Sequence, residues 1–268
     1  MPASNRVRGR SIRQAPPGRT PGRGRRRWAR WAAVAVGLAA VGVAVFLLAG
    51  GGPDPSGPRA LTEDEANRLA VTRFRNYEAR GRAVTITVPG AAGGLTVTGS
   101  VDYRGKVGYG VVRGTGRAAS GDGLIQWTAT SVYVHPLANP PAHAPASPPR
   151  SGWYDRPLQA SGSALDSALA IALKLGSDRP DNAELLPQNG AAWWGRDRVD
   201  GHRVDVMTGP SAPDRSGTAG NVRYWVGPDG TMYRVRVHVD SEERPVVIAF
   251  DDRKYVPVEP VPGVTPAR

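Results

Sequence analysis

The sequence predicts an α+β protein in which a curved antiparallel sheet follows one transmembrane helix. Hydrophobic residues recur first with the 3.6-residue period of a helix and then with the two-residue period of strands, and this order is repeated once. Glycines are frequent in and between the first strands, where they permit bulges and curvature. They are Gly99, Gly105, Gly108, Gly110, Gly114 and Gly116.

The net charge of +12 is concentrated at the N-terminus, because residues 1–30 contain ten arginines and no acidic residue. A tail of this composition can bind nucleic acid through phosphate contacts. The segment that follows explains the charge better, so we interpret residues 1–30 as a basic, disordered cytoplasmic tail and expect no nucleic-acid partner.

Residues 31–50 carry no charge and are rich in Ala, Val and Leu. A helix of this length is about 30 Å long, which matches the hydrocarbon core of a bilayer. Arginines on its N-terminal side place that end in the cytoplasm. The chain is therefore expected to be a single-pass cell membrane protein with an extracytoplasmic C-terminal domain. A cleaved signal peptide is the alternative, but the run exceeds the usual apolar region of about 7–15 residues, which favours an uncleaved signal-anchor.

Residues 51–60 are rich in Gly and Pro and are interpreted as a linker. The domain is expected to begin at Leu61, with a helix from about Glu63 to Arg80. Thr62 and Glu65 have the spacing of a capping box. Apolar residues follow at helical spacing, namely Ala66, Leu69, Ala70, Phe74 and Tyr77.

Alternating apolar and polar residues then predict an antiparallel meander. Its strands are expected at Ala83–Val88, Leu95–Tyr103, Val107–Val111, Leu124–Thr128 and Ser131–His135. The segment Pro136–Pro157 contains seven prolines and is interpreted as a loop.

A second helix is predicted over Ser163–Leu175. Asp200-Gly201 predicts a two-residue hairpin between Ala192–Val199 and His202–Met207. A further hairpin turns at Pro228-Asp229-Gly230, with valines on one face and arginines on the other. Val246–Phe250 supplies the last strand.

No catalytic motif is present in the sequence. The absence of Cys excludes a disulfide framework, a thiol nucleophile and a cysteine zinc site. The four histidines, His135, His143, His202 and His238, lack the spacing of metal ligands. We therefore expect a protein that is not an enzyme and has no cofactor and no metal. The tryptophans of the expected extracytoplasmic domain are candidates for the wall of an apolar cavity. They are Trp127, Trp153, Trp193, Trp194 and Trp225.

The helix before Gly81, the meander Leu95–His135 and the hairpin Tyr224–Gly230 with its alternating Val and Arg resemble the LolA/LprG-like lipoprotein carriers and lipid-binding envelope proteins. The resemblance covers about Leu61 to Val258 and leaves residues 259–268 as a disordered tail. It implies a strongly curved sheet, an incomplete barrel, with helices on its concave side and an acyl chain inside. Lipoprotein members are anchored by a lipidated Cys, which a transmembrane helix would replace here.

These observations predict a membrane-anchored extracytoplasmic protein that binds a membrane lipid, a lipoglycan or another lipid-linked ligand in an apolar cavity. The alternative is an envelope signalling or regulatory protein whose exported domain binds another envelope protein. The residues expected to contact the ligand are Phe74, Tyr77, Tyr109, Trp127, Leu169, Trp193, Tyr224 and Val235.

Overall fold

The computed structural model divides the chain into two compact units, Met1–Pro53 and Asp54–Arg268. It describes residues 57–91, 93–159, 163–210, 221–239, 243–250 and 254–262, all in the second unit. The predicted basic tail, transmembrane helix and most of the linker lie outside these residues. Within the described ranges, no helix combines the length and the apolar composition needed to cross a bilayer.

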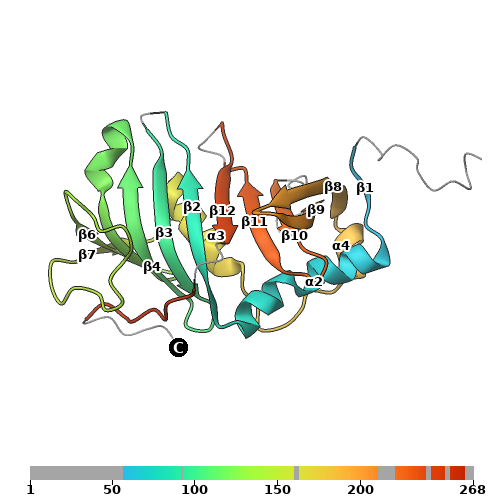
Figure 1. The fold of residues 1–268 in the computed structure, drawn as a ribbon, viewed down its shortest axis with the longest axis horizontal. Coiled ribbons are helices and arrows are strands. Elements are labelled where there is room, and N and C mark those ends of the chain that lie inside the picture. Colours follow the sequence, from blue (N-terminus) through green and yellow to red (C-terminus); the bar gives the residue numbers. More distant parts are fainter. Residues whose placement is uncertain are drawn as a thin grey trace, which may run out of the picture. The chain divides into compact units, whose positions relative to one another are not determined.

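The described residues form one open sheet of 12 strands, and every neighbouring pair is antiparallel (Figure 1). The order is β1-β8-β9-β10-β11-β12-β2-β3-β4-β5-β6-β7. Its edges do not meet, which agrees with an incomplete barrel. The strands are β1 (Arg59–Ala60), β2 (Gly81–Val88), β3 (Leu95–Asp102), β4 (Val107–Gly114), β5 (Gly123–Trp127), β6 (Ser131–Pro136), β7 (Tyr154–Pro157), β8 (Ala192–Val199), β9 (His202–Thr208), β10 (Val222–Val226), β11 (Met232–Val237) and β12 (Val246–Phe250).

The two longer helices begin where the sequence predicts. They are α2 (Glu63–Glu78) and α3 (Ala164–Lys174), accompanied by the short helices η1 (Gly116–Gly121) and α4 (Leu185–Gln188). The capping box of α2 is confirmed, because the Glu65 backbone N–H donates to Thr62 Oγ1 at 3.3 Å and the Thr62 N–H donates to Glu65 Oε2 at 2.9 Å. The Ser163 side chain caps α3, since its Oγ accepts from the Asp166 backbone N–H at 3.3 Å.

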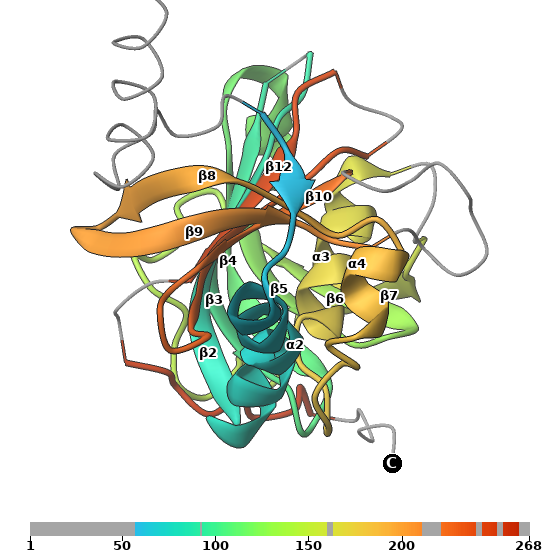
Figure 2. The same cartoon turned by 90° about the vertical axis from the view of Figure 1, so that its right-hand side faces the viewer.

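Both longer helices pack on one face of the sheet. Helix α3 contacts β12, β2, β3 and β4, whereas α2 contacts β2, β10 and β11 (Figures 1 and 2). The connection between α3 and α4 runs along α2, where the Ser177 N–H donates to the Arg73 carbonyl at 3.1 Å and the Asp181 N–H to the Ala70 carbonyl at 2.9 Å. The helices, this connection and the sheet therefore form two layers.

A continuous row of apolar side chains crosses this face from β8 to β4. Each member lies directly opposite the next on the neighbouring strand, so all of them point to the same side of the sheet. We call these residues the apolar row: Trp193, Met207, Tyr224, Val235, Ile248, Ile86, Val97 and Val112.

The other face of the sheet is also covered in part. Tyr109, Val111 and Leu124 form a small buried cluster there, against which Trp153 and Val258 pack. The proline-rich segment between β6 and β7 and the C-terminal segment 254–262 supply this cover. The predicted loop is therefore a packed structural element over much of its length.

Three sequence-based boundaries need correction. Arg59 and Ala60, predicted as linker, form β1 and pair with β8. The end of the predicted loop forms β7, an edge strand whose last residue is Pro157; edge strands tolerate proline because one side of the strand needs no donor. The predicted tail begins too early, since the Glu259 carbonyl and the Val261 N–H both bind the Gln126 side chain, at 2.8 and 2.9 Å.

Candidate functional site

Six of the eight predicted ligand residues lie on the helix-covered face. One buried cluster contains Trp127, Leu169 and Val235, and Tyr77 packs against it. A second buried cluster contains Trp193. Tyr224 packs against both clusters.

Trp127 and Leu169 are closely packed. Both side chains are fully buried, and the Trp127 indole N–H donates to the Leu169 carbonyl at 3.1 Å. The indole also lies against Gly108, where an added Cβ would stand only 2.1 Å from a ring atom. At this point α3 and the sheet are in direct contact, so Trp127 and Leu169 belong to the hydrophobic core.

Tyr77 and Tyr224 differ because they are only half-buried. Tyr224 packs against the clusters under both helices, and burial raises the pKa of its hydroxyl. Asn76 on α2 links the two longer helices here, because its side-chain amide donates to the carbonyl of Leu175, at the C-terminal end of α3, at 2.9 Å. Phe74, on α2, is half-buried and belongs to none of the buried clusters.

Tyr109 is separated from the other predicted residues by the sheet itself. It lines a pocket of about 210 Å³ on the opposite face, together with Ser100, Ala144 and Val256. Its hydroxyl is buried without a hydrogen-bond partner among the described residues, and burial raises its pKa to about 12. The alternation of strand side chains explains this placement, because Gly108 and Gly110 occupy the helix-covered face of β4.

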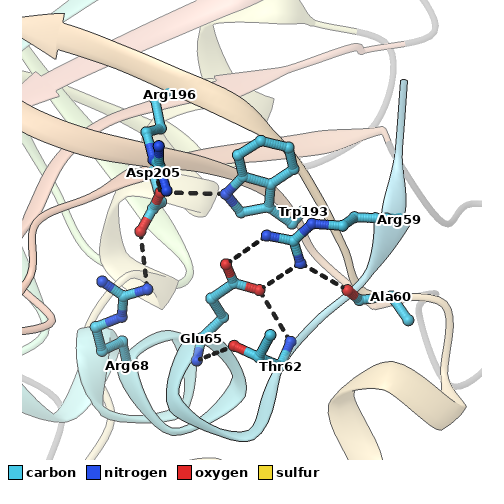
Figure 3. Close-up of polar contacts among 8 residues, drawn as sticks. All are labelled: Arg59, Ala60, Thr62, Glu65, Arg68, Trp193, Arg196 and Asp205. Carbon is cyan, nitrogen blue, oxygen red and sulfur yellow. Dashed lines mark hydrogen bonds and ion pairs between the residues drawn. The ribbon is translucent and has the colours of Figure 1, made fainter. Parts of the chain in front are cut away.

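A polar network that the sequence did not indicate lies where β1, α2 and β8 meet (Figure 3). The Arg59 guanidinium donates two hydrogen bonds to the Glu65 carboxylate, each at 2.7 Å. It also lies over the Trp193 ring, 4.1 Å from the centroid. The bidentate contact from Arg59 holds the pKa of Glu65 at about 2, below its ordinary value of 4.5.

Asp205 extends this network to the next strand. The Trp193 indole N–H donates to Asp205 Oδ1 at 3.1 Å, and Arg68 Nη2 pairs with Asp205 Oδ2 at 2.8 Å (Figure 3). Arg196 lies 4.0 Å from the same carboxylate. The end of the apolar row is thus joined directly to a group of charges.

An open groove of about 820 Å³ adjoins these charges. It is lined from α2, from the β8–β9 hairpin and from the turn after β10. The lining residues are Arg68, Arg196, Asp197, Arg198, Arg203, Val204, Asp205 and Pro228. With four arginines and two aspartates, the groove is positively charged.

The predicted Asp200-Gly201 turn contained a signal for this groove. A two-residue turn places residues 199 and 202, and then 198 and 203, directly opposite each other. Both turn residues have positive φ, 49° and 83°, and Arg198 is paired in register with Arg203.

Among the described residues, no group of three or more His, Asp or Glu side chains is placed to hold a metal ion. The polar groups described above are paired arginines and carboxylates, an arrangement suited to binding and to structural support.

Comparison with solved structures finds similar folds at low sequence identity. A LolA superfamily protein from Nitrosomonas europaea is 14% identical over 75% of this chain and 96% of its own, with a TM-score of 0.29. A DUF1329 family protein from Desulfovibrio piger is 14% identical over 71% and 91% of the two chains, with a TM-score of 0.32. An uncharacterized conserved protein from Thermus thermophilus is 9% identical over 69% and 85%, with a TM-score of 0.35.

No family model matches the sequence, and no curated protein matches it. A LolA superfamily protein is thus among the solved structures to which the chain is similar, as the sequence-based resemblance predicts. At these identities and TM-scores, no residue role and no ligand passes from those proteins to this chain.

Proposed function

We propose that this chain is a membrane-anchored extracytoplasmic protein that binds a lipid-type ligand and catalyses no reaction. The observation that carries the proposal is the apolar row, which spans the sheet from β8 to β4 under two separate helices. Sites for apolar ligands are lined mainly by aromatic and aliphatic side chains, and this row consists of such residues.

The boundary between α2 and α3 is the favoured route to the apolar row. The two helices rest mainly on different strands. Helix α2 lies over β10 and β11, and α3 lies over β12, β3 and β4. Strand β2 is the one that both helices contact extensively. Tyr224 lies where the two apolar clusters meet and is half-buried. Because the face under α3 is packed, an acyl chain would enter by parting the helices beside Tyr224.

The membrane anchor is proposed from the uncharged run at residues 31–50 and the arginines before it. A tethered protein of this kind would bind its ligand close to the bilayer. It would act as a local acceptor or sensor, since the anchor prevents free diffusion away from the membrane.

The proposal is tested by titrating the purified full-length chain, held in amphipol, with a fluorescent fatty acid, and by native mass spectrometry for lipid that copurifies. We expect saturable binding. Tyr224→Ala removes an aromatic surface at the helix boundary and should weaken binding about tenfold or more, as expected for loss of one buried aromatic contact.

Tyr133→Ala is the matched control. Tyr133 is also half-buried, but it lies on β6 between two residues of the helix-covered cluster, so its side chain points to the opposite face. Binding should be unchanged in this variant. A chain that takes up no fatty acid and carries no lipid, or equal losses in the two variants, would contradict the proposal and favour recognition of a protein partner.

A further inference from the structure

The β8–β9 hairpin holds two arginines against each other. Arg198 and Arg203 are directly opposite in the antiparallel register, where like charges repel. Among the described residues, the Arg198 guanidinium donates a single long hydrogen bond, of 3.4 Å, to the Gly201 carbonyl. For Arg203, the described part of the chain provides no hydrogen-bond or ion-pair partner. This arrangement costs stability, so an anion between these side chains would be stabilised.

Arg68 brings a third guanidinium with unused donor capacity. Its Nη2 is paired with Asp205, but its Nε is buried and has no hydrogen-bond partner among the described residues. The two oxygens of Asp205 are already engaged by Arg68 and by the Trp193 indole. A buried unpaired donor is unfavourable, and a bound oxyanion would satisfy it.

The carboxylates of the groove are both committed to other partners. Asp197 accepts from the Trp225 indole at 2.8 Å and from the Arg198 backbone N–H at 2.7 Å, and the Trp225 contact lowers its pKa most. Asp205 is held in the network already described. The arginine side chains of the groove therefore outnumber the carboxylates that face them.

The groove and the apolar row are connected through a single residue pair. Trp193 is the β8 end of the row, and its indole is hydrogen-bonded to Asp205, which lines the groove. Helix α2 spans both regions, since Ala70 packs with Trp193 while Arg68 lines the groove. A ligand with one apolar and one anionic part would therefore find the groove directly beside the buried end of the apolar row.

We propose that the groove binds the phosphate of an anionic phospholipid whose acyl chains occupy the apolar row. Guanidinium groups bind phosphate through paired, parallel hydrogen bonds, and this geometry suits the arginine pair of the hairpin. The inference rests on the proposed lipid-binding function and adds the chemical class of the ligand. In Figure 2 the hairpin extends away from α3 and α4, and the side chains of Arg198 and Arg203 are exposed.

The test compares dioctanoyl phosphatidylglycerol with dioctanoyl phosphatidylcholine, which have the same acyl chains, on the full-length chain in amphipol. Each is titrated as a competitor of the fluorescent fatty acid. We expect phosphatidylglycerol to bind more tightly, with an advantage that shrinks as salt is added. Arg198→Gln combined with Arg203→Gln should weaken phosphatidylglycerol about tenfold or more and leave phosphatidylcholine unchanged.

Two further variants keep the result interpretable. Arg117→Gln with Arg150→Gln removes the same charge from exposed positions outside the groove and should preserve the preference. Arg68→Lys keeps a cation for Asp205 but loses Nε, and should weaken phosphatidylglycerol in a protein that still melts cooperatively.

The possible failures are distinguishable. If neither phospholipid competes, the proposed lipid-binding function fails. If both compete equally, or if the hairpin variant keeps the preference, lipid binding stands and the phosphate assignment is wrong. Competition by glycerol 3-phosphate as strong as that by phosphatidylglycerol would make the groove a site for soluble phosphate esters and overturn the lipid assignment.

Discussion

The two ends of the sheet pair their charged groups in opposite ways. Beside α3, the Asp166 carboxylate is fully buried, and Arg156 matches both of its oxygens at 2.6 and 2.7 Å. At the β8–β9 end, Arg68 keeps an unpaired Nε and Arg198 faces Arg203. The first arrangement is complete within the chain, whereas the second has donors left over.

This difference separates a structural region from a binding region. The α3 end combines a closed ion pair at Asp166 with apolar packing around Trp127. The β8–β9 end is stabilised by the Arg59–Glu65 pair but retains one buried guanidinium nitrogen, Arg68 Nε, with no partner among the described residues. A buried unpaired donor is uncommon in native structures, so we expect a ligand in the groove that Arg68 lines.

The largest effect is expected from Trp127→Ala at the α3 end. Removing this fully buried side chain leaves a cavity between α3 and the sheet and should cost about 3–5 kcal/mol. The melting temperature, measured by circular dichroism, should fall by roughly 6–20 °C. Trp153→Ala, on the opposite face, removes a half-buried ring and should cost much less. Equal losses would show that the two faces are packed equally tightly.

An intermediate effect is expected from Glu65→Gln, which breaks the bidentate pair with Arg59. We expect a loss of about 1–2 kcal/mol, or roughly 2–8 °C in melting temperature at neutral pH. Glu63→Gln is the matched control, since Glu63 is exposed in the same helical turn and its loss should change little.

The same variant predicts a pH dependence. The folded-state pKa of Glu65 is lowered to about 2 from 4.5, so its stabilising contribution is fully present above the higher value. The contribution is lost as the pH falls from 4.5 toward 2. The stability gap between the unmodified chain and Glu65→Gln should therefore close over this range in acid denaturation. A gap that stays constant would show that the ion pair is not the source.

The smallest effect, and the only gain, is expected from Arg198→Gln combined with Arg203→Gln. Relief of the repulsion between opposed arginines should stabilise the protein by about 0.2–1 kcal/mol. The melting temperature, measured by differential scanning calorimetry, should rise by up to roughly 4 °C, and the rise should be largest at low salt. The Arg117 and Arg150 double variant should not show it. A fall in melting temperature would mean that the hairpin arginines support the fold.

Local patterns sufficed for most elements of the fold. The Thr62–Glu65 spacing located α2, and the Asp200-Gly201 turn located the β8–β9 hairpin. By contrast, β1 is two residues long and exists only through its pairing with β8, which no local period can reveal. The edge strand β7 was missed for the same reason, because its pairing with β6 outweighs its poor strand composition.

The candidate site was less predictable because it depends on contacts between distant residues. Sequence alone identified Trp193, Tyr224 and Val235 as apolar, and the structure aligns them in one row. It could not show that Arg68 on α2 meets Asp205 on β9. The charges of the groove come from segments more than a hundred residues apart, and only the folded sheet brings them together.

The attachment of β1 has a mechanical consequence. Any pull on the chain ahead of Gly57 reaches the sheet through Arg59 and Ala60, whose pairing with β8 covers only two residues. The Arg59–Glu65 contact and the stacking on Trp193 reinforce this short junction. Tension would therefore peel away β1 first and remove Arg59 from the face of the Trp193 ring, so the junction would respond to force before the rest of the domain.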